Sequence, residues 1–227
     1  MTKKISALLA VSLLFLAGAV RAGEAEGLAA ARAGDFKSAV REFLPLAEQG
    51  YAGSQVNLGN FYLNGLKDPL SAYPWFQKSA AQNFPSAQNA MGMYFYLGRP
   101  PVKEDNLKAR EWFQKAGLQG DSIAQFFLGE IYRKGDGIAV DLKQALGWYL
   151  KSAEQNFPNA QFRLGLMYAN AEGVNEPDML QAYKWASLAK SNGATNAADL
   201  LAAFSKNMKP DEILQASELL RQFVAKQ

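Results

Sequence analysis

The sequence predicts an all-α fold, an α-solenoid of antiparallel helix pairs, and three observations lead to this prediction. The pattern Asp-x-x-x-Ala recurs five times, at intervals of 33, 37, 36 and 37 residues. A Gly or Asn follows each of these Asp residues after fifteen positions. Between the copies lies a second apolar pattern with helical spacing, and the sequence shows no strand-like alternation. A period of this length is typical of stacked helical repeats.

The recurring Asp residues predict the start of one helix in each repeat, which we call helix B. An Asp before an apolar-periodic run is a typical N-cap, because its carboxylate accepts hydrogen bonds from the first backbone N–H groups. Gly and Asn readily adopt the left-handed conformation that ends a helix, so the two signals predict helices of about fourteen residues. The helices begin after Asp35, Asp68, Asp105, Asp141 and Asp178 and end at Gly50, Asn83, Gly120, Asn156 and Gly193.

A second helix in each repeat, helix A, is predicted just after each of the first four terminators. Small residues, Leu or Met, and aromatic residues fall at i, i+4 and i+8, which is one stripe of an α-helix. Each stripe contains a Gly, which costs roughly 1 kcal/mol inside a helix, so we expect helix B to approach closely there. The constant, short connection from helix B to helix A predicts antiparallel neighbours. The segments are 54–62, 87–95, 124–132 and 160–168, with Gly59, Gly92, Gly129 and Gly165.

The ends of the repeat array and two prolines depart from the pattern. Residues 24–33 predict a short first helix, and Pro210 begins a last amphipathic helix, as expected for units that cap a stack. Pro74 falls inside a helix B, where it would be tolerated if Ser71 rather than Asp68 were the cap. Pro45 lies in the preceding helix B, where we expect a kink.

Residues 1–22 have the three parts of a secretory signal peptide: two lysines, the apolar run 5–20, and small residues at its end. We expect cleavage after Ala22, although Ala19 allows an earlier cut. The alternative is a transmembrane anchor, for which the run is short. No Cys follows, so a lipoprotein anchor is excluded. The prediction is a periplasmic or secreted protein without stable membrane insertion after cleavage.

Charge and composition narrow the function classes. The net charge of +3 equals the three cations of residues 1–22, so the mature chain is expected to be neutral and to bind no nucleic acid. Cys and His are both absent, which excludes disulfides, zinc sites built on these residues, and catalytic triads that need an imidazole. We expect no cofactor and no metal. The Asp caps lie one repeat apart, too far to share a calcium ion.

The repeats resemble the Sel1-like repeat, a relative of the tetratricopeptide repeat, over residues 35–193. The copy beginning at Ala124 carries the pattern most fully: Ala124-Gln125, Leu128-Gly129, Tyr132, Gly135, Gly137, Asp141, Ala145, Trp148-Tyr149 and Ala153. This resemblance implies a right-handed helical superstructure that binds other proteins. It also implies a role as a periplasmic adaptor, regulator or assembly factor, or as an immunity protein against a phospholipase toxin delivered by type VI secretion.

The predicted organisation is a signal peptide over 1–22 and a single solenoid over 23–227. We expect a partial unit at about 23–50, full units at about 51–83, 84–120, 121–156 and 157–193, and capping helices over 194–227. The four tryptophans occupy one register in every unit, which indicates core packing rather than a ligand-binding ladder.

The positions that vary between copies are the candidate protein-binding residues. On helix A they project away from the repeated stripe, onto the face that lines the concave groove of related solenoids. Several are apolar where solvation would favour polar residues, as at interfaces, although superhelical twist could instead bury some of them. Glu130 is expected to be exposed, and no catalytic residue is assigned. The set is Asn57, Asn60, Asn64, Met93, Leu97, Phe127, Glu130, Lys134, Arg163, Leu166 and Asn170.

The sequence therefore predicts a non-catalytic periplasmic adaptor or scaffold that holds a protein partner in its concave face. One alternative is an immunity protein that binds a secreted lipase toxin tightly. A less favoured alternative is an envelope enzyme acting on cell-wall glycans, because two carboxylates need only meet in space.

Overall fold

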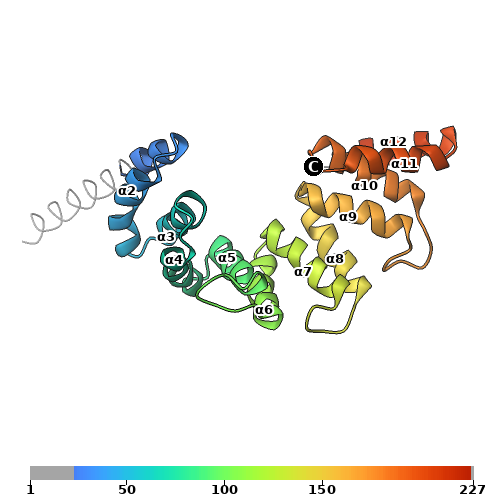
Figure 1. The fold of residues 1–227 in the computed structure, drawn as a ribbon. Helices are drawn as coiled ribbons and strands as arrows, with labels where there is room; N and C mark the ends of the chain where they lie inside the picture. Colours follow the sequence, from blue (N-terminus) through green and yellow to red (C-terminus); the bar gives the residue numbers. More distant parts are fainter. Residues whose placement is uncertain (1–22, 226–227) are drawn as a thin grey trace, which may run out of the picture. The chain divides into compact units, whose positions relative to one another are not determined.

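The structure, a computed structural model, describes residues 23–225 as two compact helical units divided between Glu104 and Asp105 (Figure 1). The described residues contain helices and connecting loops but no strand, so the predicted all-α fold of paired helices is confirmed. The predicted signal peptide lies outside the described residues. None of the described helices has the length and apolar character needed to cross a bilayer.

Unit 1 begins with a helical segment over 23–32 and continues through two helix pairs. Each helix packs on the next in chain order, α2 on α3, α3 on α4 and α4 on α5. The helices A are α3 and α5, and α3 passes directly into a short π-helix, η1. The bounds are α2 Phe36–Glu48, α3 Ala52–Asn60, η1 Phe61–Gly65, α4 Pro69–Ala81 and α5 Pro85–Tyr96.

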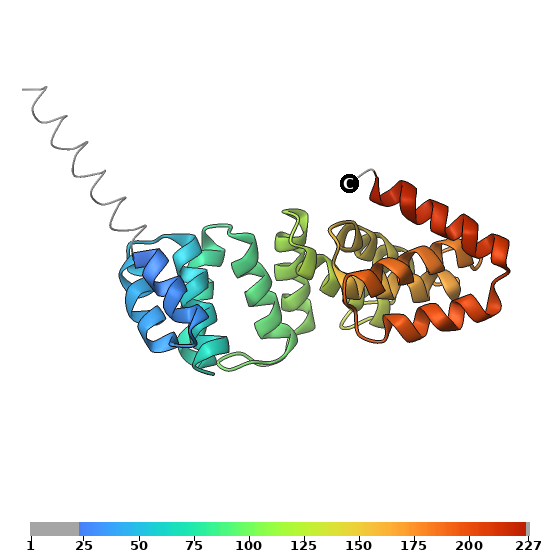
Figure 2. The same ribbon diagram turned by 90° about the horizontal axis from the view of Figure 1, so that it is seen from above.

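Unit 2 contains seven described helices, and each again packs on its neighbour in the chain from α6 to α11. The last helix, α12, packs on α10 (Figure 2). The helices A of this unit are α7 and α9, and α6, α8 and α10 are helices B. The bounds are α6 Asn106–Leu118, α7 Ser122–Lys134, α8 Leu142–Glu154, α9 Pro158–Ala169, α10 Met179–Ser191, α11 Ala197–Asn207 and α12 Pro210–Val224.

Both predicted signals of helix B are confirmed in all five copies. Each Asp side chain accepts a hydrogen bond from the backbone N–H three residues later, as at Asp141, where the distance to Gln144 N is 2.9 Å. Hydrogen bonds from the side chain and the backbone of the residue three positions later hold the pKa of Asp35, Asp68 and Asp105 below the ordinary value. Every terminating Gly or Asn has a positive φ, between 62° and 94°.

The structure places the cap of the helix containing Pro74 at Asp68, as the repeated pattern predicted, and not at the alternative Ser71. Asp68 is the cap, with its carboxylate 3.0 Å from Ser71 N, and Pro69 occupies the first turn. Pro74 therefore lies inside α4, where the helix continues past it. Pro69 suits the first helical position, where an N–H would have no partner inside the helix, whereas Pro74 removes one hydrogen bond within α4.

The glycines of helix A allow the close approach that the sequence predicted. A Cβ placed on Gly129 would lie 2.5 Å from the ring of Tyr149, and one on Gly59 would lie 2.8 Å from the ring of Phe76. At Gly165 the same atom would lie 3.3 Å from a backbone oxygen of α10. Helix A and the following helix B therefore pack with an aromatic ring or backbone against the glycine.

A buried glutamine of helix A joins neighbouring helices through its amide, a contact that was not predicted. Nε2 of Gln125 donates to the carbonyl of Gly117 in the last turn of α6, where helix carbonyls have no partner inside the helix. Nε2 of Gln155, at the end of α8, donates to Oε1 of Gln125 at 2.7 Å. One side chain thus connects three successive helices. The same contacts recur at Gln55 with Ala47 and Gln82, and at Gln161 with Ala153 and Asn192.

The tryptophans divide into two buried and two half-buried side chains. Trp148 and Trp185 are buried, whereas Trp75 and Trp112 keep part of their rings exposed. A lysine of the same helix lies over each ring, at 4.2 to 4.4 Å from its centre, which is a cation–π contact. Packing together with these lysines accounts for the tryptophan register.

Candidate functional site

The predicted binding residues of unit 1 lie on the two helices A of that unit. Asn57 and Asn60 belong to α3, Asn64 to η1, and Met93 to α5, which Leu97 follows directly. Asn64 and Leu97 are exposed, and the other three are half-buried. The predicted binding residues of unit 1 are therefore all amide or apolar, and none of them carries a charge.

The predicted residues of unit 2 lie on α7 and α9, and three of them meet. Nε of Arg163 lies 2.8 Å from Oε1 of Glu130, and Nζ of Lys134 lies 3.5 Å from its Oε2. Helices A of successive repeats are therefore joined by an ion pair. Leu166 lies further along α9, the exposed Asn170 directly follows that helix, and Phe127 precedes Glu130 on α7.

Glu130 also contacts two residues that the sequence did not single out. The hydroxyl of Tyr149 on α8 donates to Oε1 at 2.6 Å, and Nη2 of Arg133 lies 3.1 Å from Oε2. Both carboxylate oxygens thus have two partners. We refer to Glu130 with Arg133, Lys134 and Arg163 as the Glu130 cluster.

The expectation that Glu130 is exposed is wrong, because only 6% of its side chain is accessible. Tyr149 covers it from α8, and Arg163 crosses it from α9, so its burial depends on residues that are distant in sequence. The spacing of Arg133 and Lys134, three and four residues after Glu130, was a visible signal for ion pairing on one helix face.

Glu130 and Arg133 stay charged although they are partly or fully buried, because each is stabilised by the opposite charge of the other. Burial alone would raise the pKa of Glu130, but the hydrogen bond from Tyr149 and the cations Arg133 and Arg163 outweigh it, and the pKa is lowered. Burial and the carboxylate of Glu130 together raise the pKa of the Tyr149 phenol, which stays protonated and keeps donating. Burial would also lower the pKa of Arg133, but the carboxylate raises it.

Phe127, one turn before Glu130 on α7, packs against other aromatic rings. Its ring stacks on that of Phe113 from α6, with centres 5.2 Å apart and planes 10° from parallel. Phe126 meets it edge-on at 5.4 Å and continues the aromatic contact toward Tyr149 and Phe157. Phe127 is half-buried, so this packing fixes its ring while part of it stays accessible.

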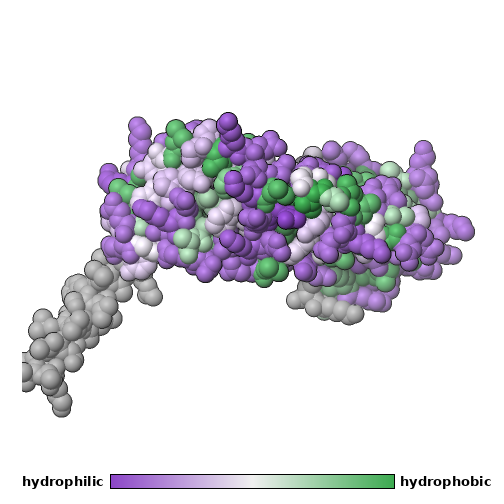
Figure 3. Space-filling model, turned by 90° about the horizontal axis from the view of Figure 1, so that it is seen from below, coloured by the Kyte–Doolittle hydropathy of each residue, from purple (hydrophilic) through white to green (hydrophobic). Residues whose placement is uncertain are grey.

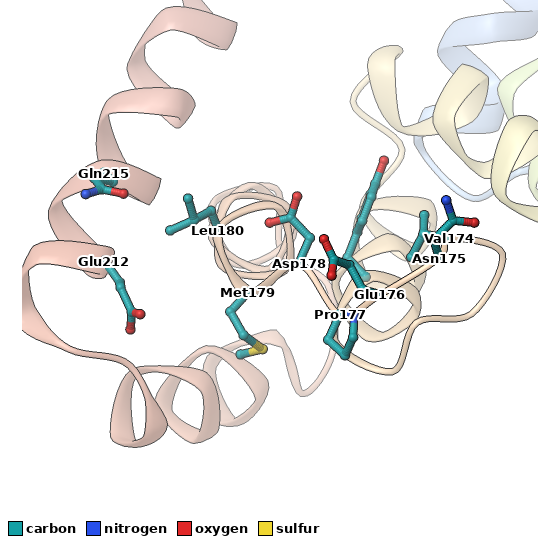
Figure 4. Close-up of a pocket in the computed structure, with 10 residues that line it drawn as sticks. Val174, Asn175, Glu176, Pro177, Asp178, Met179, Leu180, Glu212 and Gln215 are labelled. Atoms are coloured by element: carbon teal, nitrogen blue, oxygen red, sulfur yellow. The ribbon is translucent and has the colours of Figure 1, made fainter.

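Unit 2 also contains a cavity of about 560 Å³ between the loop before α10 and helix α12 (Figure 4). Three carboxylates line it, those of Glu176, Asp178 and Glu212. Two of them serve as helix caps: Asp178 accepts from Gln181 N, and Glu212 accepts from Lys209 N at 2.8 Å. Among the described residues no group of three acids, Cys or His has the arrangement of a metal site.

On one face of the molecule, hydrophobic residues form small groups. On the face drawn in Figure 3, green areas are separated by larger purple ones. The most exposed apolar side chains of unit 2 include Leu118 at 69% and Leu214 at 63%, which lie on different helices from the Glu130 cluster.

Comparison with known proteins gives one family and several solved structures. The model of the Sel1 repeat matches residues 52–84, 85–121, 122–157 and 158–193. A Sel1 repeat protein from Oxalobacter formigenes is 30% identical, with a TM-score of 0.75, over 91% of this chain and 87% of that one. Among curated proteins, no sequence matches this chain significantly.

Two further solved structures share the fold. The uropathogenic Escherichia coli protein c5321, described as a protective antigen, is 28% identical with a TM-score of 0.56, over 83% of this chain and 49% of its own. The immunity protein PA5088 from Pseudomonas aeruginosa is 18% identical with a TM-score of 0.54, over 88% of this chain and 82% of its own.

Proposed function

Because the chain belongs to the Sel1 repeat family, we propose that it is a non-catalytic scaffold that holds a protein partner on the α7 and α9 face of unit 2. The resemblance read from the repeated motifs is thus confirmed by the four matched repeats. Repeat proteins of this kind use the framework positions for packing and leave the other positions of each helix free to differ.

One observation carries the proposal: side chains at the non-repeating positions of α7 and α9 meet in the Glu130 cluster. Arg163 is the third residue after Ala160 on α9, and Glu130 is the sixth residue after Ala124 on α7. Their ion pair joins two successive repeats. Phe127 and Leu166 are half-buried next to them. An apolar centre with charged and amide neighbours is the usual anatomy of an interface between proteins.

The test of this proposal is capture of the partner, followed by a measured affinity. The tagged chain is expressed in its source cells, bound proteins are identified by mass spectrometry, and the purified partner is titrated. We expect Leu166→Asp to weaken binding by about tenfold or more. The matched control is Leu118→Asp, an equal change at an exposed residue of α6. Equal affinities for both variants, with far-UV circular dichroism unchanged, would refute the assigned face.

The periplasm is the proposed location, and the composition of residues 1–22 supports it. We expect the mature chain to begin at Gly23. Fractionation of cells and N-terminal sequencing of the purified protein test this directly. Recovery of the intact chain from the cytoplasmic fraction would contradict it.

A second candidate function is that of an immunity protein, which would bind one toxin tightly rather than several partners loosely. The shared fold of PA5088 supports it, and at 18% identity this support concerns the fold alone. The discriminating measurement is inhibition: the purified chain is added to a secreted phospholipase encoded beside its gene. Full inhibition at equal molar amounts favours this function, and unchanged phospholipase activity favours the scaffold.

A further inference from the structure

The Glu130 cluster contains more positive than negative groups. Two guanidinium groups, from Arg133 and Arg163, contact one carboxylate even before the ammonium group of Lys134 is counted. Each of the three cations lies within 3.5 Å of a carboxylate oxygen of Glu130. One internal anion therefore cannot neutralise the cluster.

The exposure of the four side chains separates the two signs of charge. Glu130 is 6% exposed, whereas Arg133 is 26%, Arg163 35% and Lys134 40% exposed. The carboxylate thus lies beneath, and the cations extend toward the solvent. A molecule that approaches this face meets the three cations first. The Glu130 carboxylate, which balances part of their charge, lies buried behind them.

The arginines also have hydrogen-bond capacity that one carboxylate does not use. A guanidinium group carries five N–H donors, and a carboxylate that already accepts from Tyr149 has few lone pairs left for them. Nε of Arg133 is buried, so an incoming carboxylate would meet the other donors of the two guanidinium groups. Arg163 contacts Glu130 most closely through Nε, and its side chain remains one-third exposed.

We propose that the Glu130 cluster binds acidic side chains, Asp or Glu, of the protein partner. This inference rests on the proposed function, because it names the chemistry by which that partner is recognised. A carboxylate is the ligand that these cations already hold in Glu130, and planar guanidinium groups pair with carboxylates through two parallel hydrogen bonds. The half-buried Phe127 and Leu166 on the same helices would contact the aliphatic part of an acidic segment.

The experiment measures binding of two labelled peptides to the purified chain by fluorescence anisotropy. One peptide is six glutamates with both ends blocked, and the other is six glutamines with the same ends. We expect saturable binding of the glutamate peptide, weakened by added salt, and no saturation with the glutamine peptide. Blocked ends assign the interaction to side-chain carboxylates.

Substitutions locate the binding on the chain. Arg163→Ala should weaken binding of the glutamate peptide by about tenfold, and Arg163→Lys by less, because lysine keeps the charge without the planar group. The matched control is Arg221→Ala, which removes an exposed arginine of α12 that also pairs with one glutamate. Thermal unfolding of each variant confirms that the fold is intact.

Three outcomes of the peptide experiment would overturn the inference, and a fourth comes from the captured partner. The first is equal binding of the two peptides, and the second is equal loss of binding for Arg163→Ala and Arg221→Ala. The third is tighter binding of a single-stranded oligonucleotide than of the glutamate peptide, which would assign the cluster to phosphates. If Arg163→Ala keeps full affinity for the captured partner while Leu166→Asp loses it, this inference fails and the scaffold function stands.

Discussion

The hydroxyl of Tyr149 donates a 2.6 Å hydrogen bond to Oε1 of Glu130, which connects α8 to the binding face of α7. The ring of the same tyrosine fills the space that Gly129 leaves open. Tyr149 is completely buried, so it cannot move without disturbing this packing. A framework residue of helix B therefore fixes the position of a carboxylate in the candidate site.

Tyr149→Phe should destabilise the fold while keeping the ring in place. The substitution removes one donor to a buried carboxylate, which costs about 1.5 to 3 kcal/mol in the free energy of unfolding. Urea unfolding followed by circular dichroism measures the change. Tyr51→Phe, at an exposed tyrosine of unit 1, is the control and should change the free energy by less than about 0.5 kcal/mol. Equal stability of the two variants would show that the hydrogen bond contributes nothing.

The contribution of Glu130 to stability should depend on pH. Its pKa in the folded chain is below the ordinary value of 4.5, so the unfolded chain takes up a proton first as the pH falls. The contribution is therefore complete above that value and is lost as the pH drops through the lowered pKa. We expect the difference in unfolding free energy between the native chain and Glu130→Gln to stay constant from about pH 6 to 8 and to shrink in acid. A difference that grows in acid would contradict this sign.

Two glycine-to-alanine substitutions should have opposite effects. Gly129→Ala places a methyl group against the Tyr149 ring, and such overpacking costs about 1 to 3 kcal/mol despite the better helix propensity of alanine. Gly147→Ala, inside α8, meets no atom within 4 Å and should stabilise the chain by about 0.5 to 1 kcal/mol. Thermal or urea unfolding compares them. Stabilisation by both would mean that the helices can separate at no cost.

The hydrogen bonds of the buried Gln125 should contribute measurably to stability. Gln125→Ala removes the side-chain donor to the Gly117 carbonyl and the acceptor for Gln155. The carbonyl keeps its hydrogen bond from Gly120 N, and Gln155 is exposed, so we expect a cost of about 0.5 to 1.5 kcal/mol for each hydrogen bond lost. The exposed Gln114 on α6 is the control, and its replacement by alanine should change the free energy of unfolding little. Hydrogen exchange at the end of α6 gives a second readout, because protection there should fall only in the first variant.

The fold was predictable because its signals are local. The cap at Asp141 and the left-handed Asn156 depend on a few neighbouring residues, and both recur in every repeat. The cap at Asp68 followed the same pattern, and Ser71 was an alternative only because Pro74 would then lie in the first turn. The preference of proline for the first turn of a helix applies equally to Pro69 and Pro74. It does not say which of the two the helix will accept in its interior.

The candidate site was predictable only in part. The positions that differ between repeats identified Arg163 and Lys134, which the structure places in one cluster. The burial of Glu130 was missed, because it depends on Tyr149, nineteen residues away, and on Arg163 in the next repeat. Contacts between repeats follow from how the helices stack, which the sequence of one repeat does not specify.

The most direct test of the scaffold function is site-specific photo-crosslinking in living cells. A benzophenone amino acid replaces Leu166 on the proposed face, and the control replaces Leu118 on α6. We predict that illumination joins one defined protein to position 166 and not to position 118. Crosslinking to that protein from position 118 alone would contradict the account.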